Sequence, residues 1–248
     1  MADLFSNTDD GRVLTSNTVG WSNARDVDTG GSVQTSETAT ANFTAVNKFS
    51  SRGGGSAFRI ERSFMYFDTS GITGTVTSAN FHIIGHSSGQ DGSIIAVKSN
   101  AFGGDGGTAL STADFDAMPG WTDGASQAGN VTNYSAAFES TSGTWNNNSS
   151  NTLTGTSDLR SDMQNNDIVI VCFLDYTNDY LNVEPSSAGT TNLGGRFSEQ
   201  TTVNARPHIN YVEVAAGYGH SVIGVASANI GKVIGVATAD IGKVIGVD

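Results

Sequence analysis

The feature that most constrains this chain is a series of short stretches with strand character, separated by turns rich in Gly, Ser and Asn. Around Ile209 and Tyr211, apolar residues alternate with polar ones, which is typical of a strand with one buried face. Residues 168–174 are apolar throughout, which suits a strand covered on both faces. The clearest stretches all fall within the first 215 residues, at 57–67, 76–84, 93–98, 168–174, 180–184 and 207–214.

Composition favours the same fold class. The 248 residues include 31 Gly and only 15% charged residues. Gly, Ser, Thr and Asn all have low helix propensity in helix interiors. Two short helices are expected, at 112–118 and 156–163, and long loops at 103–107 and 140–156. The prediction is an all-β fold, an antiparallel β-sandwich or jelly roll over residues 1–215 with a short C-terminal β-repeat tail.

After Val214 the composition changes to a linker at 216–220 and then a repeat over 221–248. The motif that begins at Lys232 begins again at Lys243, a period of 11 residues. Its Gly residues and Val/Ile pairs predict short strands joined by Ala-Asn or Ala-Asp turns rather than a helical supercoil.

Two and a half copies of this repeat are too few to bury their own apolar surface. They must pack on the body, on sister chains or in a larger assembly, and an exposed Val/Ile-rich segment would otherwise aggregate. We therefore expect self-association, as a homotrimer, or docking to other proteins. The apolar residues predicted to oligomerise or anchor the chain are Val222, Ile223, Val225, Ile230, Val233, Ile234, Val236, Ile241, Val244 and Ile245.

The formal net charge of −12 disfavours binding to nucleic acid or to an anionic membrane surface. Cys172 is the single cysteine and lies in an apolar run, so no intramolecular disulfide is expected. No secretory signal is visible at the N-terminus, and no apolar run is long enough to cross a bilayer.

Acids, bases and nucleophiles do not form a recognisable catalytic motif, so no enzymatic activity, catalytic residue or cofactor is predicted. His82 and His86 could share a strand face, but no third ligand is evident and a structural role is favoured. Calcium suits the chain better than zinc, although Asp-Gly pairs are first of all turn signals. The loop carboxylates in question are Asp9, Asp10, Asp26, Asp28, Asp91 and Asp105.

Tryptophans could contact glycans, because aromatic faces stack on sugar rings. The available aromatic residues are Trp21, Trp121, Trp145, Tyr134 and Tyr218. Trp121 and Trp145 are favoured, since they flank the loop-rich middle of the chain. Packing in the core is the alternative for both.

Two motifs resemble a known family. Residues 62–68 (Arg-Ser-Phe-Met-Tyr-Phe-Asp) with 76–84, and Arg196-Phe-Ser-Glu199 with 206–212, resemble the two ends of DNRLRE-type β-sandwich domains, which are similar to carbohydrate-binding modules. The resemblance implies a sandwich that serves adhesion, surface assembly or glycan contact, without catalysis.

The repeat also resembles tails of bacteriophage structural proteins, in which Ile-Gly-Lys-Val units recur. This resemblance implies a virion structural protein, a fibre or capsid-decoration subunit that is made in the host cytoplasm and assembles with other virion proteins. Host surface glycans are a further expected partner. The alternative is an extracellular carbohydrate-binding module or adhesin domain.

Overall fold

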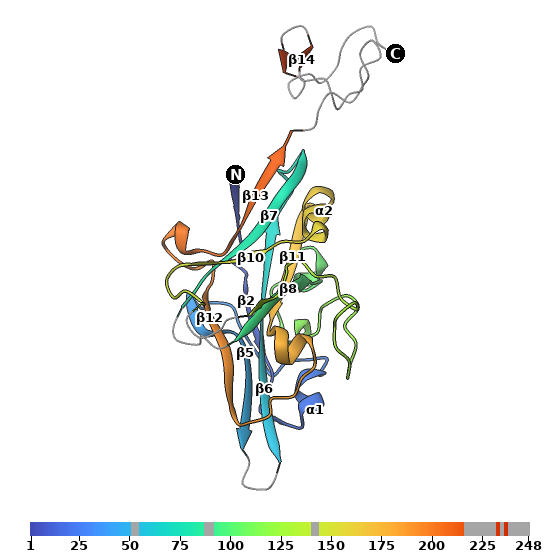
Figure 1. Ribbon diagram of the computed structural model, residues 1–248, viewed down its shortest axis with the longest axis vertical. Coiled ribbons are helices and arrows are strands. Elements are labelled where there is room, and N and C mark those ends of the chain that lie inside the picture. The colour runs from blue at the N-terminus through green and yellow to red at the C-terminus, as the bar shows by residue number, and fades with distance from the viewer. Residues whose placement is uncertain (51–54, 87–91, 140–143, 216–231, 234–235, 238–248) are drawn as a thin grey trace.

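Two antiparallel sheets form the body of the protein in the computed structural model (Figure 1). The structure describes residues 1–50, 55–86, 92–139, 144–215, 232–233 and 236–237. The smaller sheet has the order β1 (Ala2–Phe5), β13 (His208–Val214), β7 (Thr75–Ile84), β10 (Ser150–Thr154). The predicted all-β antiparallel sandwich is confirmed.

The larger sheet has nine strands and is organised around β6 (Ser56–Asp68). One path through it runs β12 (Gly189–Arg196), β5 (Ala39–Ser50), β6, β11 (Ile168–Leu174), β8 (Ser93–Lys98) and β9 (Phe138–Glu139). β2 (Gly11–Leu14) and β3 (Thr18–Val19) also pair with β6, and β4 (Ser32–Gln34) pairs with β2.

Alternation along β6 divides the interior into two cores. Phe58, Phe64 and Tyr66 point to one side of the large sheet, whereas Met65 and Phe67 point to the other. The second side faces the small sheet, and we call its apolar cluster the inter-sheet core. The first side is covered by loops and short helices, and we call its cluster the loop-side core.

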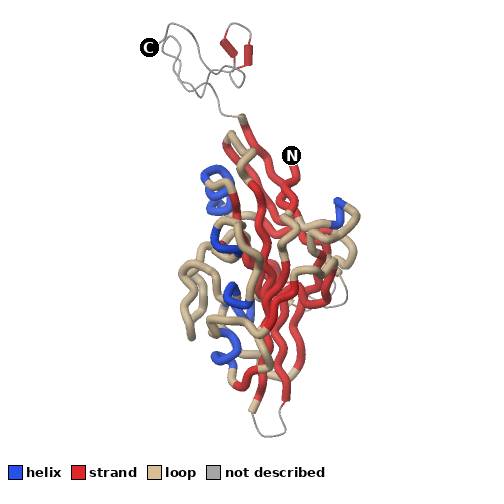
Figure 2. Tube along the Cα trace, turned by 180° about the vertical axis from the view of Figure 1, so that it is seen from behind, coloured by secondary structure: helices blue, strands red, loops and turns tan. Residues whose placement is uncertain are grey.

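Most of the helices and long loops gather on one side of the sheets (Figure 2). They include α1 (Trp21–Arg25), a π-helical turn at Tyr176–Tyr180 and 3-10 turns at Phe102–Gly104 and Thr112–Asp114. α2 (Ser157–Asn165) lies on the same side in Figure 2, but its buried residues Leu159 and Met163 belong to the inter-sheet core. A further 3-10 turn at Val203–Ala205 lies away from this group, at the left of Figure 1.

Five of the six predicted strands are present, and the sixth prediction is wrong. Residues 180–184 follow the π-helical turn, where the Asp175 side chain accepts a hydrogen bond from Asn178 N and starts a helical turn instead of a strand. The predicted helix at 156–163 is α2, capped by Thr156. The one at 112–118 is only a single 3-10 turn, Thr112–Asp114.

The N-terminal strand β1 and the end of β13 lie at the same end of the elongated body (Figure 1). The hairpin between β5 and β6 forms the opposite end. In the repeat, the structure describes one antiparallel pair, β14 (Lys232–Val233) with β15 (Val236–Ala237). Both strands of this pair belong to the repeat copy that begins at Lys232. The predicted Ala-Asn and Ala-Asp turns lie outside the described residues.

Candidate functional site

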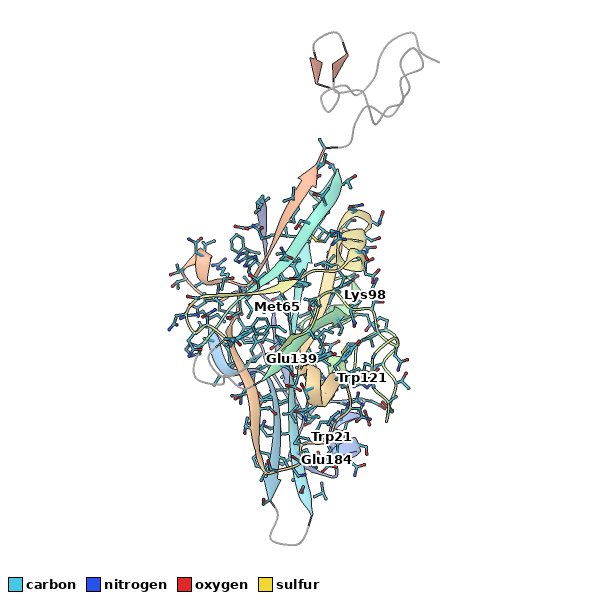
Figure 3. All side chains as sticks on the ribbon, viewed as in Figure 1. Trp21, Met65, Lys98, Trp121, Glu139 and Glu184 are labelled. Carbon is cyan, nitrogen blue, oxygen red and sulfur yellow. The ribbon has the colours of Figure 1, made fainter. Side chains whose placement is uncertain are left out.

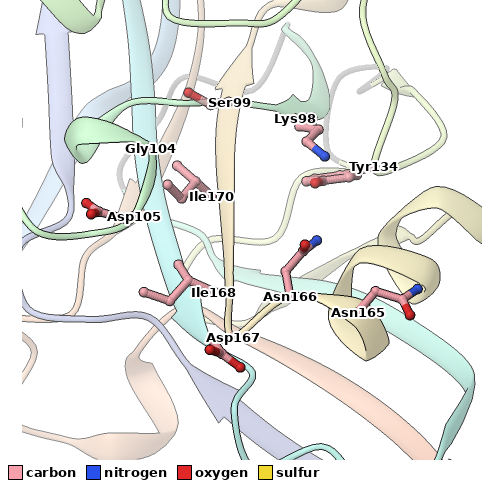
Figure 4. A pocket seen from close by; sticks show the side chains of 10 residues that line it. All are labelled: Lys98, Ser99, Gly104, Asp105, Tyr134, Asn165, Asn166, Asp167, Ile168 and Ile170. Carbon is pink, nitrogen blue, oxygen red and sulfur yellow. The ribbon is translucent and has the colours of Figure 1, made fainter.

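A groove of about 590 Å³ lies beside the C-terminal end of α2 (Figure 4). α2 ends at Asn165 and β11 begins at Ile168, so the polar residues between them lie at the groove rather than in a strand. β8 is the neighbour of β11, with Val171 opposite Lys98, and this brings the end of β8 to the same place. The lining residues are Lys98, Ser99, Gly104, Asp105, Tyr134, Asn165, Asn166, Asp167, Ile168 and Ile170.

Two residues of the groove lining, Lys98 and Tyr134, form a hydrogen-bonded triad with Asp162. Lys98 Nζ donates to Asp162 Oδ2 at 2.8 Å, and the hydroxyl of Tyr134 donates to the same oxygen. Burial acts to raise the pKa of Asp162, but the hydrogen bonds from Lys98 and Tyr134 outweigh it and hold the pKa below its ordinary value. Burial, and then the hydrogen bond to Asp162, raises the pKa of Tyr134. The triad therefore supplies hydrogen-bonding groups that hold one another in place.

The mouth of the groove is formed by amide and carboxylate side chains. Asn165, Asn166 and Asp167 are exposed, and the Asn166 amide is directed towards Lys98 and Tyr134 (Figure 4). Amides offer both donors and acceptors, whereas the carboxylate only accepts. This mixture matches the hydroxyl groups of a polyol, each of which can donate and accept. Tyr134 is only 1% exposed, so its ring does not offer a stacking face.

The prediction that Trp145 contacts glycan is wrong, because its side chain is 1% exposed and belongs to the inter-sheet core. Its Nε1 donates to Gly194 O at 2.9 Å, and its ring meets Phe138 edge-on at 5.5 Å. The hydrophobic character that suits a tryptophan to sugar stacking also suits it to burial between two sheets, and sequence could not separate these outcomes.

Trp121 is half-buried on the loop-covered side of the body, below Lys98 in Figure 3. The guanidinium groups of Arg25 and Arg62 lie over its ring, at 4.6 and 4.2 Å from the ring centroid. Trp121 packs against the loop-side core and does not line the groove. The structure thus brings neither predicted glycan contact into the groove.

The residues weighed as metal ligands are spread over separate contacts. His82 stacks on His208, with ring centroids 5.0 Å apart, rather than pairing with His86. Asp10 is buried and accepts from Ser6 and Ser198, and Asp105 accepts from the backbone of its own loop. Within the described ranges no group of three or more His, Cys, Asp or Glu side chains could hold a metal ion, and Asp91 lies outside those ranges.

Cys172 is fully buried in β11, and burial raises the pKa of its thiol.

Of the residues predicted to oligomerise or anchor the chain, Val233 and Val236 are paired with each other between β14 and β15. The other eight lie outside the described residues: Val222, Ile223, Val225, Ile230, Ile234, Ile241, Val244 and Ile245.

Comparison with known proteins finds no family model and no curated protein that matches this chain. The helices in the described part of the chain are too short or too polar to span a membrane. The motifs that resemble DNRLRE-type domains lie in β6, in β7, at the end of β12 and in β13. Three of these strands hold inward-facing core residues such as Phe67, Phe81 and Ile209. Packing in the core therefore explains the apolar positions of those motifs.

Proposed function

We propose that the chain is a structural subunit of a bacteriophage virion, a fibre or capsid-decoration protein, in which the C-terminal repeat oligomerises or anchors a β-sandwich body. The apolar repeat carries this proposal. A segment with this many Val and Ile residues requires an apolar partner, and two and a half copies cannot supply it alone.

The place where the body ends supports the proposal. β13 ends at Val214, at the end of the body opposite the β5–β6 hairpin (Figure 1). The linker at 216–220 and then the repeat follow in the sequence. Assembly at this end would leave the distal β5–β6 hairpin directed away from the point of attachment.

The test is light scattering coupled to size-exclusion chromatography, on the full chain and on a chain that ends at Ala215. We expect a homotrimer, or a larger oligomer, that becomes monomeric on truncation. A matched full-length variant with Val233→Asp and Val236→Asp should weaken assembly without removing any residue of the two cores. Monomers in all three samples would contradict self-assembly. Unchanged incorporation of the truncated chain into particles would contradict anchoring.

The groove favours a second candidate function, a carbohydrate-binding or adhesin domain. Its donors and acceptors come from three separate segments and meet in one polar concavity. Glycan binding should then weaken in Asn166→Ala and Asp167→Ala. Asn130→Ala is the matched control, because Asn130 is an exposed amide outside the groove lining. Equal glycan affinity in all these variants would remove the groove from consideration.

A further inference from the structure

A second concavity, of about 500 Å³, lies on another part of the body. β7 contributes His82 and Ile84, the end of β12 contributes Arg196, and the first residue of β13 is His208. Hydroxyl and amide side chains complete its wall: Asn148, Ser149, Ser150, Gln200, Thr202 and Asn204. We call this concavity the arginine pocket.

Arg196 is the cation of this pocket, and the hydrogen-bond partners of its side chain among the described residues are neutral. Its Nη1 donates to Gln200 Oε1 at 3.0 Å and its Nη2 donates to Asn148 Oδ1 at 2.6 Å. Its Nε is buried and has no partner. None of the ion pairs found among the described residues includes Arg196.

Arg196 lacks a counter-ion although the chain has 24 Asp and Glu against 12 Lys and Arg. The most buried arginines, Arg12, Arg25 and Arg62, all pair with carboxylates. A partly buried charge without a partner loses hydration without compensation, and an oxyanion would restore it through charge-assisted hydrogen bonds. The two amide oxygens already hold the guanidinium in place for such a ligand.

Two histidines add titratable donors to the pocket. His208 Nδ1 lies 3.0 Å from Arg206 O, and because a carbonyl only accepts, this nitrogen carries the proton. His82 Nδ1 lies 2.7 Å from Ser150 Oγ. The two rings are stacked, with planes 3° apart, so protonation of both would place like charges together.

The other charged groups around the histidines come from two strands, β1 and β12, and from the loop between β12 and β13. Burial, and then His208, lowers the pKa of His82, whereas Asp3 on β1 acts in the opposite direction. Arg206, whose Nε donates to Gln200 O at 2.8 Å, adds a second guanidinium, and Glu199 interacts with it. The surroundings therefore hold two arginines and two histidines against two carboxylates.

We propose that the arginine pocket binds a small oxyanion, a carboxylate or a phosphate group, through the Arg196 guanidinium and the protonated imidazoles of His82 and His208. The inference goes beyond the proposed virion role, because it concerns the body alone and holds for a monomer. A bound anion would neutralise the positive charge of the Arg196 guanidinium. It would also reduce the repulsion between the stacked imidazoles of His82 and His208 when both are protonated. Binding should therefore strengthen as the pH falls.

The experiment follows the imidazole proton resonances of His82 and His208 in the full-length protein by NMR. Inorganic phosphate and glucuronate are the two anionic probes, and glucose is the neutral control. At about pH 6 we expect either anion to shift these resonances and glucose to leave them unchanged. A response to glucuronate alone would assign the site to carboxylates, and a response to phosphate alone would assign it to phosphates.

Arg196→Gln should weaken the binding of the responding anion by about tenfold or more, because a charge-assisted contact is lost. Arg160→Gln is the matched control, since Arg160 lies outside the pocket and donates only to Gly155 O. The wild-type protein offers a second readout that needs no variant. With saturating anion, the pKa of His82 should rise, because a bound negative charge favours the protonated imidazole. The proposal fails if neither anion shifts the histidine resonances, or if Arg196→Gln binds as wild type does.

Discussion

The two faces of the large sheet are covered in different ways. On one face the small sheet packs against it, and the inter-sheet core is built from apolar side chains such as Phe81, Leu153 and Phe173. On the other face loops and short helices pack against it, and buried charges accompany the apolar residues. Arg25, Arg62 and Asp179 are all fully buried there, with Arg62 held by both oxygens of Asp179 at 2.7 and 2.8 Å.

The difference shows what each kind of layer must satisfy. Strands pair their own backbone groups, so a second sheet needs to present only apolar side chains. A loop layer leaves carbonyl groups unpaired, and here the two guanidinium groups donate to them. Arg62 donates to Phe115 O and Arg25 O, and Arg25 donates to Ala125 O and Asp179 O. At this place the loops can cover the sheet because the buried guanidinium groups of Arg25 and Arg62 pair the carbonyl groups that the loops leave free.

Arg62→Met should have the largest effect, because it leaves Asp179 and two backbone carbonyls without their donor. We expect a loss of about 3–5 kcal/mol in the free energy of unfolding, measured by urea denaturation. Hydrogen exchange should rise first in residues 99–131, which form the loop layer. Arg59→Gln, on the same strand but partly exposed, should cost about 1 kcal/mol or less. A small effect of Arg62→Met would mean that the loop layer does not depend on the buried charges.

Leu153→Ala tests the other face. Leu153 is 1% exposed in the inter-sheet core, and its truncation should cost about 3 kcal/mol through lost transfer energy and a cavity. Here exchange should rise across both sheets, because the contact holds them together. Val183→Ala, at a residue that is 49% exposed, should change stability little. If Leu153→Ala loosened only the loop layer, the division into two cores would be wrong.

The pH dependence of stability should follow two buried carboxyl groups. Burial raises the pKa of Asp175 to about 6 and that of Asp10 to about 7, above the ordinary value of 3.8. The folded state then binds more protons than the unfolded state between about pH 4 and pH 7. The two groups therefore contribute most to the free energy of unfolding near pH 4, and this contribution is lost as the pH rises towards 7.

We expect a decrease on the order of 2 kcal/mol between about pH 5 and pH 8, measured by urea denaturation at each pH. Asp10→Asn and Asp175→Asn should each flatten this dependence, whereas Leu153→Ala should keep it. Constant or rising stability over this range would show that the two carboxyl groups are ionised in the folded state throughout.

Tyr134→Phe should have the smallest effect of the series. Its ring lies in the inter-sheet core and its hydroxyl reaches Asp162 at the groove, so only one hydrogen bond is removed. Asp162 keeps Lys98, and the expected cost is about 1 kcal/mol in thermal or urea unfolding. Tyr66→Phe is the matching substitution in the loop-side core, because Tyr66 packs there and its hydroxyl donates to Asp9 at 3.3 Å. A cost for Tyr134→Phe as large as that of Arg62→Met would mean that the triad supports the fold.

Strands that carry a clear apolar pattern could be predicted from sequence, and β6, β7, β8, β11 and β13 are examples. β5 and β12 were missed because Thr, Asn, Ala and Gly dilute their patterns. Their pairing also needs a register shift between Leu193 and Gly195. A Cβ at Gly195 would come within 2.6 Å of the Phe43 ring, so a glycine is required by a contact 152 positions away in the chain.

The candidate sites were harder to predict, because their residues are distant in sequence. Lys98, Tyr134 and Asn166 meet only because β8, the loop after it and the end of α2 converge. Likewise the arginine pocket joins His82 to Arg196 and His208, and no local motif marks these residues as a group.

The sequence by itself determined the strand-forming period, the apolar 11-residue repeat and the excess of acidic residues. These are properties of neighbouring residues and of composition, which need no knowledge of the fold. Only the tertiary structure decided that Trp145 is buried, that Arg62 is paired and that Arg196 is not. Burial and charge pairing depend on which distant strands and loops come together, and that is set by packing over the whole body.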